Sequence, residues 1–359
     1  TPLVTFDHLA ATWQAASWSV RGLMLVGLSG LLAMALLHFR LLVWNLMQYR
    51  AYRRGDGLAT LRRSNGEVVL MTIPLTLAMS INVLFVVGAV FVPGLWDVVE
   101  YLFPFALVGF LAVGVYALRL YGGYITRMIT TGTFDFVANA SLSQLVPIFA
   151  FAMIAVGFAA PGAMSPQVEL HAIGILLSVF FLSLAMLLGI VKLVLGVSSM
   201  LRHGLDVAAS PSIWIVIPIL TLFGIAAVRL TMGLHHGFHE PVSRPGLFVL
   251  TSAILSLEIL FGLIGYAVMK RLGYFRDYLR GEKNHPGAFA LVCPGVAFFV
   301  FGMFWIVFGL VQNGLVERFG LVFFLLMLPL AWVQLKTLAT LLRLNRKLLS
   351  APPVALTAT

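Results

Sequence analysis

The sequence predicts an all-α protein that crosses a membrane many times, and three observations carry this prediction. Hydrophobic residues make up 61% of the 359-residue chain and charged residues only 10%, whereas a soluble domain has about 45–50% apolar and about 25% charged residues. The apolar residues fall into long runs, and short motifs in those runs recur at a regular interval. One core cannot hide this much apolar surface, so lipid must cover the rest.

Nine of the apolar runs are long enough to cross the hydrocarbon core, which takes about 20 residues as a helix. We predict nine spans, or ten if the first residues of the chain add one. They lie at about 18–44, 68–92, 99–122, 141–160, 169–200, 211–232, 246–270, 288–311 and 319–343.

The basic residues orient these spans. Five arginines lie in Tyr49–Arg63, five Lys/Arg in Lys270–Lys283, and more in Arg343–Lys347, all on one side when the spans alternate. Three of the opposite loops, "VPGLWD", "APGAMSPQ" and "HHGFHEPVSRP", contain a single arginine or lysine, Arg244. Because positively charged loops stay inside, we predict a multi-pass protein of the inner (plasma) membrane with a cytoplasmic C-terminus. The net charge of +10 is therefore a topology signal, and nucleic acid is not an expected partner.

Alternate spans share an apolar–apolar–Pro–apolar core. It occurs in "MTIPLTLA" at Pro74, "QLVPIFAF" at Pro147, "IVIPILTL" at Pro218 and "LVCPGVAF" at Pro294, with spacings of 73, 71 and 76 residues. Prolines are common in membrane helices, but matching phase and flanking residues favour a true repeat of helical hairpins. Transporters place broken helices around the transported substrate, so we expect four proline-kinked inner helices around a polar path.

Counting one repeat length back from Pro74 leads to the start of the chain, where a further proline-bearing helix is expected. Residues 1–17 are short and polar, so we interpret them as a degenerate or truncated first inner helix. Residues 18–345 form the predicted single transmembrane hairpin-repeat domain, and residues 346–359 form a cytoplasmic tail.

The order of the motifs resembles the tellurite-resistance/dicarboxylate-transporter family, which includes the slow anion channels of plant guard cells and fungal sulfite exporters. The resemblance covers about residues 60–345. "RRSNGEVVLMTIPLTLAMS" resembles the third helix of that family, "SPSIWIVIPILTLFGIA" the seventh and "GAFALVCPGVAFF" the ninth. It implies a homotrimer whose protomers each surround a quasi-five-fold central pore for small anions, and no cofactor.

Two features depart from the family pattern. The His-Pro and the arginine before the third helix are missing, with Asn65-Gly66-Glu67 in their place. The phenylalanine that closes the pore of the channel members falls on Cys293 or Pro294, and neither is aromatic. Phe289, about one turn earlier, or Phe298, beyond the proline, is a candidate to fill that position.

Several residues are candidates for the path itself. A pore should present small and hydroxyl side chains, and Thr72, Thr76 and Ser80 recur at spacings of four. Cys293 is either a buried small residue or a thiol that faces the path.

An isolated carboxylate is rare inside a membrane and marks a functional hypothesis. Glu258 lies in the middle of the span 246–270, so we expect it to be neutral or paired with a cation such as Arg229 or Arg21. A structural pair between helices is the simpler interpretation of Glu258.

The remaining chemistry-bearing residues give weaker patterns. The cluster His235–Glu240 contains metal-binding residue types without fixed helical spacing, and His38 and His171 have no second histidine one turn away for haem. We predict no metal, no cofactor and no enzyme activity. The leading hypothesis is a channel or exporter for small anions; the alternative is a non-transporting membrane subunit of a larger, redox complex on the same scaffold.

Overall fold

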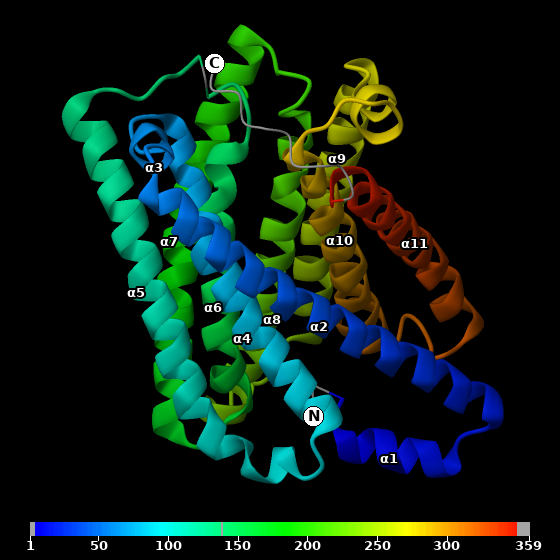
Figure 1. The fold of residues 1–359 in the computed structure, drawn as a ribbon. Coiled ribbons are helices and arrows are strands. Elements are labelled where there is room, and N and C mark those ends of the chain that lie inside the picture. The colour runs from blue at the N-terminus through cyan, green and yellow to red at the C-terminus, as the bar shows by residue number, and fades with distance from the viewer. Residues whose placement is uncertain (1–3, 138, 350–359) are drawn as a thin grey trace. The chain divides into compact units, whose positions relative to one another are not determined.

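The computed structural model describes residues 4–137 and 139–349 and is all-α over them (Figure 1). Within these ranges nine helical stretches are long and apolar enough to cross a membrane, which confirms the predicted all-α polytopic class. The elements, in order, are α1 (Phe6–Ala15), α2 (Trp18–Arg54), α3 (Gly57–Leu61), η1 (Asn65–Met71), α4 (Thr72–Phe91), η2 (Leu95–Val98), α5 (Val99–Thr131), η3 (Ser143–Leu145), α6 (Val146–Met164), α7 (Val168–His203), η4 (Ser210–Ile215), α8 (Val216–Phe238), α9 (Arg244–Arg271), η5 (Phe275–Arg280), η6 (Pro286–Leu291), α10 (Val292–Phe304), η7 (Trp305–Val311) and α11 (Leu321–Leu349).

The helices extend past the predicted spans at their basic ends. The first span was expected to end near residue 44, yet α2 continues to Arg54, and α5 continues to Thr131. Arginine, lysine and tyrosine lower the hydropathy of a segment without stopping a helix, and long basic side chains reach the interface by snorkelling. A left-handed Gly132, with φ 63°, ends α5, because glycine adopts this conformation without strain.

Each of the four repeated prolines lies in the first turn of an α-helix that directly follows a 3₁₀ segment. Pro74, Pro147, Pro218 and Pro294 are the second or third residues of α4, α6, α8 and α10, and all four are buried. N–H groups in the first turn of an α-helix have no partner within the helix, so proline, which lacks an N–H group, fits there without loss of a hydrogen bond. The prolines therefore mark the change from 3₁₀ to α geometry near the start of each span, and their position in the helix agrees to within one residue in all four copies.

Local capping explains why three of these 3₁₀ segments begin where they do. The Ser64 hydroxyl accepts from the Gly66 amide at 3.2 Å and begins η1, and the His285 ring accepts from the Gly287 amide at 3.1 Å and begins η6. Pro211 in the first turn of η4 has the same effect through its fixed φ.

The hairpin organisation is visible in the packing. Three of the 3₁₀ segments that precede a proline helix pack on the second helix of their own hairpin, which comes after the proline helix. These contacts are η1 on α5, η4 on α9 and η6 on α11. For η3 the contact is a hydrogen bond of 3.4 Å from Lys192 Nζ on α7 to Gln144 Oε1. The repeat seen in the sequence is thus a repeat of structure, with one 3₁₀-plus-α helix followed by one continuous helix.

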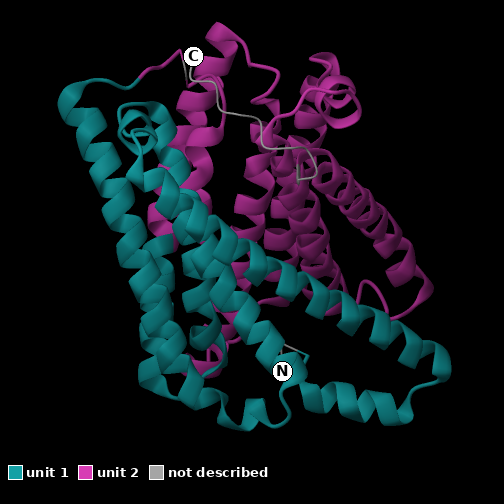
Figure 2. Ribbon diagram, in the orientation of Figure 1, with its two compact units in different colours: residues 1–134, 153–181 teal, residues 135–152, 182–359 magenta. Residues whose placement is uncertain are grey.

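The chain divides into two compact units, residues 1–134 with 153–181 and residues 135–152 with 182–359 (Figure 2). In the first unit α6 and α7 approach closely where Gly162 meets Gly174. Phe158 of α6 stacks on Phe181 of α7, with ring centroids 5.7 Å apart. Small residues at such a crossing allow two membrane helices to pack backbone to backbone.

The second unit has two apolar clusters. One joins η7 and α11 through Ile306, Leu310, Val316, Phe323 and Leu330. The other joins the end of α9 to the loop after it and to η6, through Met269, Tyr274 and Leu291. Lys347 near the end of α11 donates to the backbone oxygens of Tyr278 and Lys283 at 2.7 Å, which fixes that loop.

Tyr274 in this loop gives a stability prediction. Its side chain is fully buried, and its hydroxyl has no hydrogen-bond partner among the described residues. A buried hydroxyl without a partner costs about 1–3 kcal/mol, so we expect Tyr274→Phe to raise the free energy of unfolding by about 1 kcal/mol.

The same prediction has a pH signature. Burial, and then the neighbouring Tyr278, raise the pKa of Tyr274 from 10.0 to about 12. Between these values the unfolded chain has lost a proton that the folded chain keeps, so wild-type stability falls as the pH rises from 10 to 12. Thermal unfolding in mild detergent should show a smaller alkaline loss for Tyr274→Phe. An equal loss in both proteins would contradict this assignment.

Candidate functional site

A groove of about 820 Å³ lies between α2 and α4 in the first unit. Figure 1 shows α2 crossing over α4. Both polar and apolar side chains line the groove. The lining residues come from α2, η1, α4 and the α3 turn and are Leu42, Asn45, Leu46, Gln48, Tyr49, Ala51, Tyr52, Leu61, Val69, Leu70, Thr72, Ile73, Thr76 and Leu77.

The α4 wall carries the hydroxyl row that the sequence predicts. Thr72 and Thr76 line the groove, and Ser80 lies one turn further along α4. The three hydroxyls donate to the backbone oxygens of Val69, Thr72 and Thr76, each at 2.8 Å. A residue three or four positions back is the usual partner of a helical Thr or Ser. The row runs from the exposed Thr72 to the buried Ser80, so it leads inward along the helix.

His38 closes the inner end of this row. Its Nε2 lies 2.8 Å from the Ser80 hydroxyl, which joins α2 to α4. From the sequence, His38 is a candidate haem ligand only, and its contact with Ser80 is not predicted. The signal was present, because a histidine inside a span needs a hydrogen-bond partner, but the sequence does not say which helix supplies it.

One end of the groove lies beside the turn from α2 into α3 and has a cation next to it. Tyr49 and Tyr52 of α2 line it, and the Arg53 guanidinium lies 6.0 Å from the centre of the Tyr49 ring. Tyr52 donates to the Gly57 oxygen at 2.7 Å and holds the chain where it turns from α2 into α3. Arg53 is thus the arginine that lies beside this end of the groove, next to the lining residue Tyr49.

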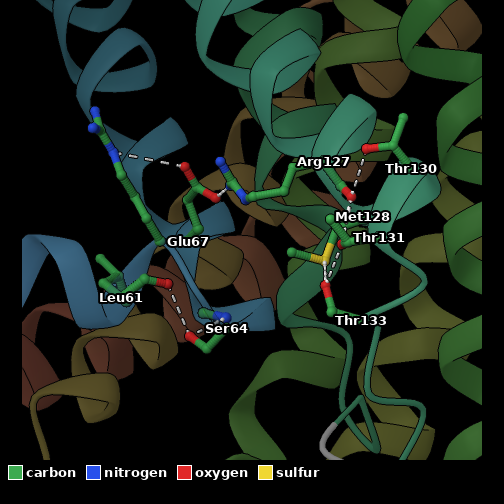
Figure 3. Close-up of polar contacts among 10 residues, drawn as sticks. Leu61, Ser64, Glu67, Arg127, Met128, Thr130, Thr131 and Thr133 are labelled. Carbon is green, nitrogen blue, oxygen red and sulfur yellow. Dashed lines mark hydrogen bonds and ion pairs between the residues drawn. The ribbon is translucent and has the colours of Figure 1, made fainter.

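Glu67 fixes the position of α4 relative to α5 (Figure 3). Its buried carboxylate forms an ion pair with Arg127 in the last turns of α5 and lies 3.9 Å from Nε of Arg62. Because the Arg62 side chain is 51% exposed and that of Arg127 35% exposed, solvent weakens both pairs. In the sequence, Glu67 stands out only as a departure from a family motif. Its role is to hold η1, and with η1 the start of the hydroxyl row.

In the second unit, Glu258 of α9 is fully buried, and Thr221 of α8 donates to its Oε1 at 2.6 Å. The sequence predicts that Glu258 is either neutral or paired with a cation such as Arg229 or Arg21. In the described second unit, no ion pair joins Glu258 to Arg229 within 4.0 Å. The Arg21 guanidinium donates to the Trp13 and Gln14 oxygens near its own end of α2.

The candidates around the only cysteine lie at the start of α10. Cys293 is partly exposed and Pro294 is buried. Phe289 is partly buried within η6. Phe298 packs on the cluster between η7 and α11, so it takes part in helix packing.

The outer-loop histidines form no metal-like group. His235 Nδ1 lies 2.8 Å from the backbone oxygen of Glu240. Across residues 4–137 and 139–349, no three His, Cys, Asp or Glu side chains gather closely enough to hold a metal ion.

Comparison with family models, with curated proteins and with solved structures finds no match for this chain.

Proposed function

We propose that the protein is a membrane channel or exporter for small anions and that the groove between α2 and α4 is part of the path. The observation that carries the proposal is the inward-leading row Thr72, Thr76, Ser80 and His38, which begins at the end of the groove where Arg53 lies over Tyr49. The resemblance to the tellurite-resistance/dicarboxylate-transporter family supports the same substrate class.

The chemistry of the groove suits a small anion. Guanidinium groups raise the local concentration of anions at the mouth. A hydroxyl proton can turn from the backbone oxygen toward a passing anion, because the C–O bond rotates freely. The apolar side chains between these groups bind nothing tightly, and a path must release what it binds. By the positive-inside rule, the mouth beside Arg53 opens to the cytoplasm.

Anion flux into liposomes tests this proposal. We expect the wild-type protein to carry a small anion such as nitrate or chloride faster than protein-free liposomes. Thr76→Val keeps the shape of the side chain and removes the hydroxyl. Loss of one hydrogen bond of about 1 kcal/mol in the path should lower the flux about fivefold.

Thr130→Val is the matched control. Thr130 donates to the Thr126 oxygen at 2.9 Å, as Thr76 does to Thr72, but it does not line the groove. Its flux should equal that of wild type. Equal fluxes for Thr76→Val and wild type would remove the groove from the path. Wild-type flux no greater than that of empty liposomes would favour the non-transporting subunit.

A further inference from the structure

Glu258 is a carboxyl group in the middle of a membrane span with no exposure to solvent. It is the fifteenth residue of the 28-residue helix α9. Its neighbours Ile254 and Leu255, on the same helix, are buried apolar residues. Leaving a carboxylate charged and unpaired at this depth is strongly unfavourable, and a carboxyl group in such surroundings binds a proton instead.

The hydrogen bonding of Glu258 is incomplete. Oε1 accepts from Thr221, which is itself buried, while Oε2 has no partner among the described residues. A carboxylate held for structure alone accepts several hydrogen bonds or a cation. With one donor and one oxygen without a partner, a neutral carboxylic acid is much less unfavourable here than a charged carboxylate.

Titratable groups on the surrounding elements are few and distant along the helices. The elements packed on α9 are η7, α8, η4 and α10. Neither η7 nor η4 contains a titratable residue, and on α10 the only one is Cys293. On α8 the nearest is Arg229, eight residues past Thr221, about 12 Å along the axis; His235 and His236 lie further away. On α9 itself Arg244, Tyr266, Lys270 and Arg271 lie toward the ends.

Thr221 connects Glu258 to a proline helix. It lies three residues after Pro218, in the turn that follows the change from 3₁₀ to α geometry. Movement of α8 at this change would separate the Thr221 hydroxyl from the carboxyl group. The carboxyl would then lose its hydrogen-bond donor and could exchange its proton with water that enters.

We propose that Glu258 is an exchangeable proton-binding site in the membrane interior and that it couples anion movement to a proton. In the resting state the carboxyl is neutral and bound by Thr221; separation of α8 from α9 opens it to exchange. The coupling rests on the transport function proposed above, whereas the proton site stands without it.

Infrared spectroscopy of the purified protein at neutral pH tests the proton site without reference to transport. We expect a carbonyl-stretch band of a protonated carboxylic acid that disappears in Glu258→Gln. In Thr221→Val the band should move to higher frequency, because the hydrogen bond to the carbonyl is lost. In D₂O the wild-type band should shift, which shows that the proton exchanges.

Glu100→Gln is the matched control. Glu100 accepts from Ser165 at 2.7 Å, as Glu258 does from Thr221, but it lies at a helix end and is partly exposed. This variant should keep the band. A band that is absent at neutral pH, that survives in Glu258→Gln, or that does not shift in D₂O would overturn the proton site.

Flux under a pH gradient tests the coupling. We expect an imposed gradient to drive anion accumulation with wild type, and at least a tenfold smaller accumulation with Glu258→Gln, while Glu100→Gln behaves as wild type. Equal accumulation with Glu258→Gln would overturn the coupling. If no protein carries anions under any condition, transport itself is wrong, and the infrared band alone decides the proton site. If Glu258→Gln fails to fold, Thr221→Val supplies both the band shift and the flux comparison.

Discussion

Gly174→Ala should lower the free energy of unfolding by about 3 kcal/mol, the upper end of what overpacking a tight contact costs. A Cβ at this position would lie 2.7 Å from the Gly162 nitrogen, 2.9 Å from the Phe158 oxygen and 3.0 Å from the Gly162 Cα. All three are backbone atoms of α6, so no side chain can turn away. The two helices must separate, and the Phe158–Phe181 stack beside the crossing is strained with them.

Gly123→Ala is the matched control for this prediction. Gly123 is also a helical glycine of the first unit, on α5, and a Cβ there meets nothing within 4 Å. Alanine is favoured over glycine in a helix by about 1 kcal/mol, so Gly123→Ala should keep or raise the stability. Thermal unfolding of the two variants in mild detergent makes the comparison. Similar midpoints would mean that α6 and α7 do not cross at Gly162 and Gly174.

Fold class and repeat could be predicted because each rests on a local property. Hydropathy reports how much lipid-compatible surface a segment has, and a proline restricts only its own turn and the preceding residue. The four prolines therefore predicted the same local geometry four times. The exact form of that geometry, a 3₁₀ segment followed by an α-helix, depends on capping by residues such as Ser64 and His285. The predicted helix ends were too early because hydropathy falls where basic residues begin, whereas these residues still favour a helix and α2 and α5 continue through them.

The candidate site was harder to predict because it depends on which helices are neighbours. A spacing of four places Thr72, Thr76 and Ser80 on one face of a helix, but it does not say that α2 covers that face. His38 and Glu67 were missed for the same reason, since each acts through a partner 42 or 60 residues away in the sequence. The homotrimer stays a prediction, because a single chain contains no interface with a second copy.

Cys293 is partly exposed at the start of α10. Gly295, two residues later, lies against Thr337 of α11. Two residues turn a helix by about 200°, so Cys293 points away from α11. Val296, about 60° from Cys293 around the helix, is 39% exposed. The sequence resemblance aligns the residue that closes the channel members with Cys293 or Pro294, and of these two Cys293 is partly exposed and Pro294 is buried.

Cys293→Phe should therefore reduce anion flux at least about tenfold, which corresponds to a barrier raised by about 1.4 kcal/mol. The cause is steric, because an aromatic ring fills a constriction that a thiol leaves open, and no change in charge is involved. Cys293→Ser, of nearly equal size, is the control and should keep the wild-type flux. Labelling with a small thiol reagent should modify wild type at this position, because the Cys293 side chain is partly exposed. An unreactive thiol together with unchanged flux in Cys293→Phe would contradict this prediction. It would show instead that the cysteine packs against another helix and does not face the anion path.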